Sequence, residues 1–165
     1  MEKTTRRKRS KGVCQYCGKE YTKTGMLKHL STCKERQSAW LPQGNGDKAT
    51  GYFTLSIEGK YRKDYWLIVE IREDAELRDL DQFLRDIWLE CCGHLSAFRI
   101  DGGFYEVDPD PDYGKGLSMD VRVKDILRVG MTFEHEYDYG STTVLKINVI
   151  SYRKGWDEIE VEIMA

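Results

Sequence analysis

The chain has 165 residues, of which 40% are hydrophobic, 33% charged and 12% aromatic. This composition predicts a folded globular protein, because disordered chains are poorer in aromatic and aliphatic residues. We find no apolar stretch long enough for a transmembrane helix, and no apolar segment of a secretory signal after the basic N-terminus. We expect no membrane contact. Five cysteines without an export signal favour a reducing, cytoplasmic environment over a disulfide framework.

The formal net charge of −2 conceals a strong division along the chain. Residues 1–36 contain eleven Lys and Arg against three Glu, a net charge of +8, whereas residues 37–165 carry a net charge of −10. Opposite charges predict different roles for the two segments. The basic segment is suited to a polyanion such as nucleic acid. The alternative is a solubilising tail without a specific partner.

The chain divides into four segments by composition. Residues 1–12 are basic and aperiodic, which predicts a disordered arm. Residues 13–36 carry a metal-binding pattern, and residues 37–50 are rich in Gly and polar residues, which is typical of a linker. Residues 51–165 alternate in hydropathy and contain an amphipathic stretch. We expect this last segment to form a domain that folds without the metal-binding segment.

The domain is predicted to consist mostly of strands. Strands are expected at 52–57, 65–72, 95–100, 104–107, 132–139, 143–152 and 158–164, and helices at 77–88 and 121–127. A turn at Asp101, Gly102 and Gly103 would join two of the strands. The fold class is therefore α+β, with a mainly antiparallel sheet, one long and one short helix, and a small N-terminal zinc-finger module.

Four side chains in residues 13–36 have the spacing of metal ligands. Cys14 and Cys17 are separated by two residues, as in a tight knuckle turn, and the permissive Gly18 follows them. His29 and Cys33 are four residues apart and share one helical face. Three thiolates and one imidazole favour tetrahedral Zn²⁺, and four protein ligands leave no open position for catalysis. We predict a structural Zn²⁺ ion at these four residues.

This pattern resembles a ββα zinc finger in which a cysteine is the last ligand. Tyr21 occupies the position of the family's aromatic residue, three positions after the second cysteine. The spacing before His29 is one residue shorter than the family's usual spacing, so either Met26 or Leu27 must supply the buried aliphatic side chain. Met26 has the better helical offset from His29.

Residues 51–165 contain several blocks that resemble the plasmid pRiA4b Orf-3-like family. The blocks are Tyr65-Trp66-Leu67-Ile68-Val69-Glu70-Ile71, Leu77-Arg78-Asp79-Leu80-Asp81-Gln82-Phe83-Leu84, His94-Leu95 with Phe98, and Phe133-Glu134-His135-Glu136-Tyr137-Asp138-Tyr139-Gly140. After Gly140 the chain departs from the family, with Ser141, Thr142 and Thr143 in place of its Asp and Trp. The resemblance implies a compact α+β domain and implies no established reaction.

Two clusters of reactive side chains in the domain suggest other sites. Glu134, Glu136 and Asp138 share one face of a predicted strand. They would serve acid–base chemistry, bind a divalent ion or form an ordinary solvated face. We favour the solvated face, and we expect His135 to be a hydrogen-bonded core residue. Cys91, Cys92 and His94 are close in sequence, and we favour packing in the core over a thiol or metal site.

The function that we predict is that of a non-enzymatic zinc-binding protein associated with nucleic acid. The residues proposed to contact nucleic acid are Arg6, Arg7, Lys8, Arg9, Lys11, Lys23 and Lys28. Such phosphate contacts would be largely independent of base sequence. The acidic domain would contact a protein partner. The alternatives are a purely structural or protein-binding zinc module, and an uncharacterised enzyme that uses the Glu134, Glu136 and Asp138 face.

Overall fold

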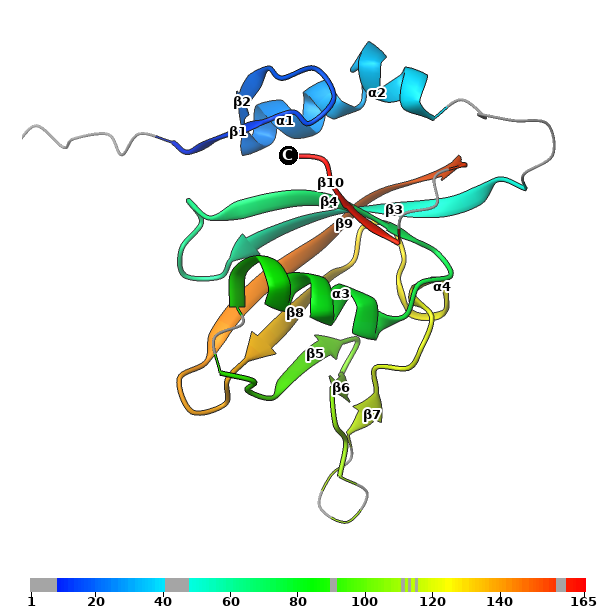
Figure 1. Ribbon diagram of the computed structural model, residues 1–165. Coiled ribbons are helices and arrows are strands. Elements are labelled where there is room, and N and C mark those ends of the chain that lie inside the picture. The colour runs from blue at the N-terminus through cyan, green and yellow to red at the C-terminus, as the bar shows by residue number, and fades with distance from the viewer. Residues whose placement is uncertain are drawn as a thin grey trace, which may run out of the picture.

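The computed structural model describes residues 9–40, 48–89, 92–110, 112, 114, 116–156 and 160–165. A small N-terminal module, residues 11–39, lies against one face of a larger sheet (Figure 1). Its elements are β1 (Lys11–Val13), β2 (Glu20–Thr22), α1 (Lys23–Leu30) and α2 (Lys34–Ala39). The first part of the predicted linker, 37–50, is thus helical at residues 37–39. The predicted disordered arm, 1–12, ends earlier than expected, because Lys11 and Gly12 belong to β1. Residues 1–8 and 41–47 lie outside the described residues.

The larger sheet has eight strands in the order β10-β4-β3-β9-β8-β5-β6-β7. Neighbouring strands are antiparallel, except that β6 and β7 are parallel. The strands are β3 (Thr50–Gly59), β4 (Trp66–Arg72), β5 (Ser96–Ile100), β6 (Gly103–Glu106), β7 (Leu117–Ser118), β8 (Thr132–Tyr137), β9 (Thr143–Gly155) and β10 (Val161–Ile163). The α+β prediction is confirmed, although the short strand β7 was not predicted.

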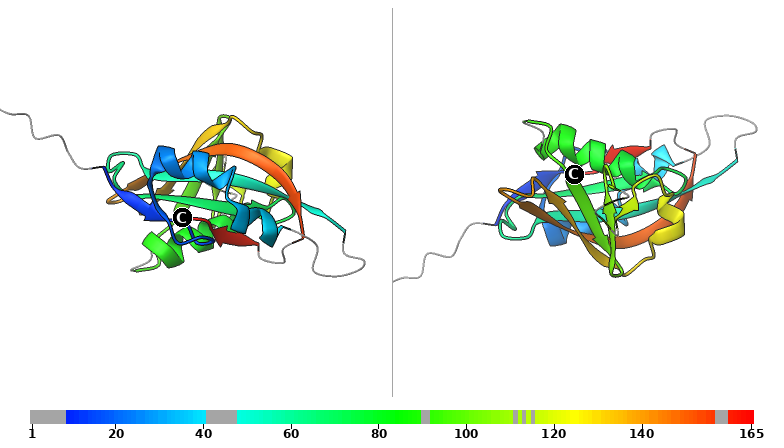
Figure 2. Two further views of the ribbon diagram at one scale, coloured as in Figure 1. Left: turned by 90° about the horizontal axis from the view of Figure 1, so that it is seen from above. Right: turned by 90° about the horizontal axis from the view of Figure 1, so that it is seen from below.

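The helices of the domain cover the face of the sheet opposite the N-terminal module. They are α3 (Leu77–Leu84), continued by a π-helical segment (Arg85–Leu89), and the short α4 (Val123–Ile126). Figure 2 shows α1 and α2 across the sheet from above and α3 across it from below. No helix of the described residues is long and apolar enough to cross a bilayer.

Strands β3 and β4 are buried on both faces, and their sequences explain why. Along β4, the side chains of Trp66 and Ile68 pack toward the N-terminal module, whereas Val69 and Ile71 pack toward the helices. A strand that is covered on both faces reads as a continuous apolar run rather than as an alternating one. The apolar stretch of residues 66–71 therefore encodes a central strand with a layer on each side.

The apolar side chains form two clusters. The main core consists of Phe53, Leu55, Ile57, Val69, Ile71, Ala75, Leu77, Leu80, Leu84, Phe98, Ile100, Met119, Val123, Leu127, Phe133, Leu145, Ile147 and Val149. The interface cluster consists of Cys14, Met26, Leu30, Cys33, Trp66, Ile68, Met164 and Ala165. The predicted turn after β5 is confirmed, because Asp101 and Gly102 have φ angles of 47° and 80° and a tight hairpin turn requires positive φ.

Candidate metal centre

The knuckle predicted around Cys14 and Cys17 is formed in the structure. The amide of Gly18 donates to the carbonyl of Cys14 at 2.9 Å, and the amide of Cys14 donates to the carbonyl of Lys19 at 3.0 Å. These bonds close the turn that brings the two cysteine side chains to the same side. Gly18 has a φ of 71°, a left-handed conformation that disfavours any residue with a Cβ atom.

Helix α1 carries the imidazole to the knuckle. Thr22 caps the helix by accepting a hydrogen bond from the amide of Gly25 at 3.4 Å. The ring of His29 stacks on Tyr21, with ring centroids 4.4 Å apart, which fixes the orientation of the imidazole. Met26 is fully buried and Leu27 is only partly buried. The prediction that Met26 supplies the buried aliphatic side chain is therefore confirmed, because Met26 is a buried member of the interface cluster.

The four predicted ligands converge. One donor atom from each of Cys14, Cys17, His29 and Cys33 lies within 4.8 Å of the others. The Cys17 Sγ and His29 Nε2 atoms are 3.2 Å apart. Tetrahedral Zn²⁺, with bonds of roughly 2.0–2.3 Å, holds its donors roughly 3.3–3.8 Å apart. Among the described residues, no other group of three or more potential ligands has this proximity. The group could therefore bind a metal ion.

Hydrogen bonds and burial act differently on two of the candidate ligand thiols. Burial would raise the pKa of Cys14, but hydrogen bonds from the backbone at Cys17 and Tyr16 outweigh this effect and lower its pKa. Burial raises the pKa of Cys33 to about 11. A metal ligand must be a thiolate, so binding a metal here would release protons.

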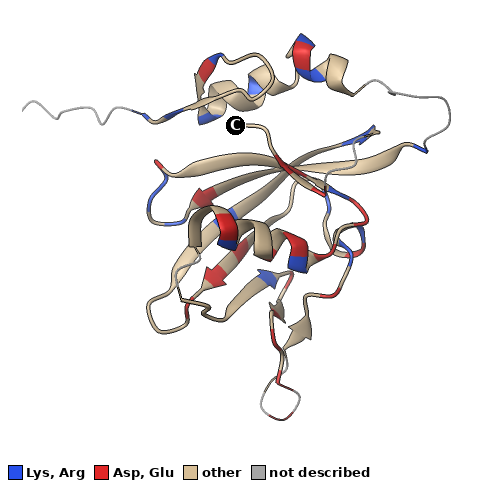
Figure 3. Ribbon diagram, viewed as in Figure 1, with Lys and Arg blue, Asp and Glu red and all other residues tan. Residues whose placement is uncertain are grey.

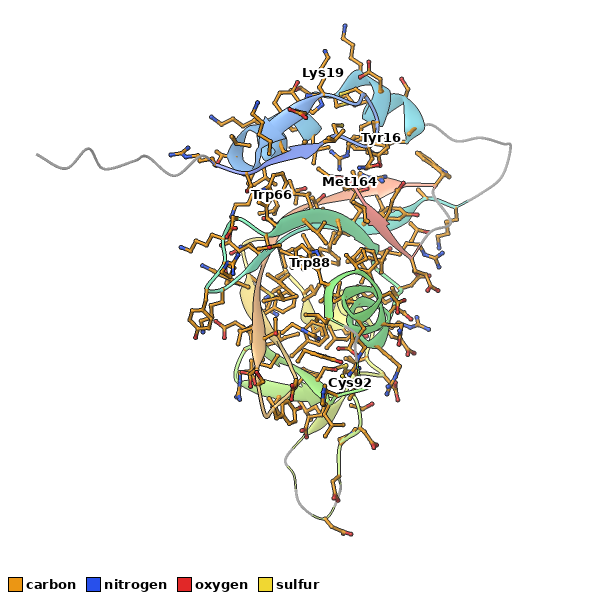
Figure 4. The ribbon with its side chains drawn as sticks, turned by 60° about the vertical axis from the view of Figure 1, so that its left-hand side comes forward. Tyr16, Lys19, Trp66, Trp88, Cys92 and Met164 are labelled. Carbon is orange, nitrogen blue, oxygen red and sulfur yellow. The ribbon has the colours of Figure 1, made fainter. Side chains whose placement is uncertain are left out.

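The metal-ligand group sits directly on the domain. The amide of Gln15, inside the knuckle, donates to the carbonyl of Met164 at 3.0 Å. Met26 and Leu30 of α1 pack on Trp66, Ile68 and Met164 in the interface cluster, and Figure 4 shows Trp66 and Met164 beneath the module. Two of the four ligands, Cys14 and Cys33, belong to the same cluster. The module and the domain thus share apolar packing around the candidate centre.

A buried ionic cluster fastens α2 to the sheet. Glu70 of β4 is 2% exposed and pairs with Arg36 of α2 and with Arg153 of β9, whose Nε lies 2.9 Å from Oε1 of Glu70. Thr54 donates a further hydrogen bond to Oε1 of the same carboxylate at 3.2 Å. The guanidinium groups of Arg36 and Arg153 lie 4.3 and 4.6 Å from the ring of Trp40.

Sequence reasoning missed this ionic cluster. The available signal was a single glutamate within the apolar run of residues 66–71. A carboxylate at the centre of a doubly covered strand requires a buried cation. The sequence does not indicate which of its 26 Lys and Arg residues would supply that cation.

The predicted nucleic-acid contacts are placed as follows. Arg6, Arg7 and Lys8 lie outside the described residues. Arg9, Lys11 and Lys28 are exposed. Lys23 is different, because it forms an ion pair with Glu58 of the domain and its side chain is 29% exposed. The assignment of these residues to nucleic-acid contacts stays a prediction.

The carboxylate face of β8 is engaged in ion pairs. Lys60 Nζ lies 2.7 Å from Glu134, and Arg99 Nε lies 2.6 Å from Glu136. Asp138 lies beyond the end of β8, with a φ of 60°, so the predicted strand ends two residues early; its carboxylate is 3.8 Å from His94 Nε2. These contacts agree with the predicted solvated strand face, on which cations compensate the carboxylates.

His135, on the opposite face of β8, is fully buried and joins a polar network. Its Nε2 lies 2.6 Å from Asp81 Oδ1, as expected for a hydrogen-bonded core histidine. The predicted core packing near Cys92 is wrong, because Cys92 is exposed. Cys91 lies outside the described residues.

Comparisons with known proteins bear on the fold alone. No protein-family model and no curated protein matches the chain. The chain is similar in structure to a protein of unknown function from Methanosarcina mazei Go1, with a TM-score of 0.58 and 16% sequence identity. The similarity covers 68% of this chain and 66% of that chain. The resemblance to the plasmid pRiA4b Orf-3-like family stays a prediction.

Proposed function

We propose that the protein is a non-enzymatic nucleic-acid-binding protein whose N-terminal module is held together by a structural Zn²⁺ ion. The convergence of Cys14, Cys17, His29 and Cys33 is the observation that carries the zinc assignment. Three sulfur donors and one nitrogen donor match the structural sites of Zn²⁺, and a fourth protein ligand leaves no position for a reactive water molecule. Zinc would therefore fix the module rather than perform chemistry.

Elemental analysis tests the zinc assignment. Protein purified without added metal should contain about one equivalent of zinc, because a closed structural site retains its ion. Of the five thiols, Cys14, Cys17 and Cys33 should react slowly with a thiol reagent until a chelator is added. Metal-free protein with all five thiols equally reactive would contradict the assignment.

The charge of the module supports the nucleic-acid role. The described residues 9–36 contain seven Lys and Arg against two Glu, and Arg9, Lys11, Lys19, Lys28 and Lys34 are exposed. Exposed cations at this density attract phosphate with little dependence on base sequence. One short module could read only about three base pairs, so we propose affinity without high specificity.

Salt dependence tests the nucleic-acid role. If about five cations neutralise phosphates of duplex DNA, the log–log dependence of the association constant on salt should have a slope of about −4 to −5. Replacing Arg6, Arg7, Lys8 and Arg9 by alanine should make the slope about 3 to 4 units shallower. Absence of binding at low salt would rule this role out.

A second candidate function is a purely structural or protein-binding module. The observation that favours it is the interface cluster, since the buried face of α1 is occupied by the domain rather than available to a ligand. The exposed face of the helix, with Thr24 and Lys28, remains accessible in either case. Titration of the intact chain with nucleic acid at low salt separates the two candidates.

A further inference from the structure

A groove of about 710 Å³ lies between the N-terminal module and the turn that joins β3 to β4. Residues 9–10 and 22–24 line it on the module side, and residues 58–66 contribute the other wall. Figure 3 shows Lys and Arg residues on both segments at the same end of the molecule. The groove exists only because the module is docked on the sheet, since each of its two walls belongs to a different piece.

The groove is basic although the domain as a whole is acidic. Its charged lining residues are Arg9, Lys23, Lys60 and Lys63, against Glu58 and Asp64. Lys23 is paired with Glu58, and Lys60 is paired with Glu134. Within the described part of the chain, Arg9 and Lys63 are exposed and form no ion pair. These two cations are therefore available to an anionic ligand.

An exposed aromatic side chain stands beside these cations. Tyr61 is 77% exposed, which is the highest exposure among the large hydrophobic side chains recorded for the described residues. The Lys60 ammonium lies 5.8 Å from the centroid of its ring. Aromatic rings next to a basic groove act as stacking platforms for unpaired bases, whose faces are accessible only in single strands. In a duplex those faces are already stacked on one another.

The start of helix α1 adds a favourable dipole to the same wall. Thr22, Lys23 and Thr24 line the groove, and the first turn of α1 contains no acidic residue. The first backbone amides of a helix attract phosphate groups. The charges, the ring and the helix start thus favour the same chemistry, a phosphate backbone that carries exposed bases.

We propose that a single-stranded nucleic acid binds in this groove, with phosphates at Arg9 and Lys63 and a base stacked on Tyr61. The inference rests on the proposed nucleic-acid function and deepens it. It adds a strand preference that the basic arm alone would not provide. It also assigns a binding role to the turn at residues 60–64, which belongs to the otherwise acidic domain.

Fluorescence anisotropy of the intact chain with labelled oligonucleotides of about ten nucleotides tests the proposal. Oligothymidylate and oligouridylate distinguish a DNA ligand from an RNA ligand, and a duplex of equal length tests the strand preference. Lys63→Glu should weaken single-strand binding about tenfold, and Tyr61→Ala about five- to tenfold. Tyr61→Phe should retain binding. Lys124→Glu makes the same charge change at an exposed position on α4, and should bind like the unsubstituted chain.

The outcomes separate this inference from the proposed function. If the unsubstituted chain binds no nucleic acid, both are wrong. If it binds, but Lys63→Glu is no weaker than Lys124→Glu and Tyr61→Ala has no effect, the groove is not the binding site, although the nucleic-acid function stands. Polyglutamate carries negative charge without bases. If it displaces the oligonucleotide at equal charge concentration, the groove is a general polyanion site and the single-strand assignment is overturned.

Discussion

The two apolar clusters of the protein are built on different principles. The main core draws most of its residues from a continuous sheet and from α3 and α4, and the buried polar residues Asp81, Ser96 and His135 lie beside it. The interface cluster is small, and half of its members, Trp66, Ile68, Met164 and Ala165, come from the domain. On the module side, two of the four buried residues are the metal ligands Cys14 and Cys33. The module therefore has too little apolar surface to fold without help from the metal or the domain.

A buried carboxylate lies beside each cluster, and each of the two carboxylates holds a different element against the sheet. Asp81 of α3 accepts hydrogen bonds from Arg85 at 2.8 Å and Ser96 at 2.7 Å, and so ties α3 to the sheet beside the main core. Glu70 ties the N-terminal module to the opposite face of the sheet. Because the two clusters have separate members, we predict that the domain can lose the module without losing its main core. It also predicts which substitutions affect only one cluster.

Loss of a metal ligand should have the largest effect on the interface cluster. In Cys17→Ser, the zinc content should fall from about one equivalent to a small fraction, because one of the four ligands is lost. Structural zinc contributes roughly 10–16 kcal/mol of apparent folding free energy in isolated fingers, so the module should then lose stability. Hydrogen exchange should show that amides of residues 11–39 lose protection. Amides of β8 and β9 should keep theirs, since these strands belong to the main core.

The matched control is Cys92→Ser. Cys92 is exposed and lies outside the ligand group, so its substitution should leave zinc content and exchange unchanged. Equal loss of protection in the module and in β8 after Cys17→Ser would show that the two clusters unfold as one unit. That result would contradict the expectation that residues 51–165 fold without the module.

The buried Glu70 provides the next test. Glu70→Gln removes the negative charge between Arg36 and Arg153, and breaking a buried ion pair costs about 3–5 kcal/mol. We expect this loss in urea-induced unfolding. The control is Glu20→Gln in the module, since the Lys11–Glu20 pair is 3.9 Å long and both side chains are more than half exposed. An exposed pair contributes at most about 1 kcal/mol. Equal effects of the two substitutions would disprove the role of Glu70.

The sequence predicted the structure within the module and within the domain better than it predicted the contacts between them. The ligand spacing identified the metal centre, because a local turn brings Cys14 and Cys17 together and His29 and Cys33 lie close in sequence. The predicted shared helical face of His29 and Cys33 is wrong, since α1 ends at Leu30 and Cys33 is the extended N-cap of α2.

Strand alternation identified the sheet, and the alternating residues 133–137 placed His135 in the interior. The docking of the module could not be predicted, because it depends on contacts between distant segments, such as Gln15 with Met164 and Arg36 with Glu70.

The basic groove was missed for a related reason. The turn at residues 60–65 reads Lys-Tyr-Arg-Lys-Asp-Tyr, and this mixture of basic and aromatic residues in an acidic domain was a local signal. Its significance appears only when the module lies beside it and brings Arg9 to the same groove. A count of net charge over residues 37–165 averages this turn with the acidic remainder.

Acid should weaken the main core through Asp81. Burial would raise the pKa of this carboxyl, but hydrogen bonds from His135, Ser96 and Arg85 outweigh that effect and hold its pKa below the ordinary value of 3.8. A carboxyl with a lowered pKa in the folded state stabilises the fold above its unfolded pKa, and this stabilisation is lost as the pH falls through the folded value. We expect urea unfolding to show this loss below about pH 4.

Substitution of Asp81 sharpens the pH test. Asp81→Asn should cost about 1.5–3 kcal/mol at neutral pH, the usual contribution of hydrogen bonds to a charged group. It should also flatten the pH dependence below about pH 4. Asp125→Asn, on the exposed surface of α4, should change neither property by more than about 0.5 kcal/mol. An unchanged acid profile in Asp81→Asn would show that other carboxylates govern acid unfolding.

The smallest expected effect compares two glycines inside the N-terminal module. Gly18 has a φ of 71° and no atom within 4 Å of an added Cβ. Gly18→Ala therefore meets no steric clash with other residues, and its only unfavourable term is the strain of the left-handed backbone. That conformation costs about 1–2 kcal/mol for residues other than glycine, and zinc affinity measured by competition with a chelator should fall about five- to thirtyfold.

Gly25 lies within α1, where an added Cβ would meet Thr22 Oγ1 at an ordinary 3.4 Å. Gly25→Ala should therefore stabilise the helix by about 0.5–1 kcal/mol and preserve or raise zinc affinity. If both substitutions lower the affinity equally, the knuckle conformation does not determine metal binding, and the packing of α1 on the domain does.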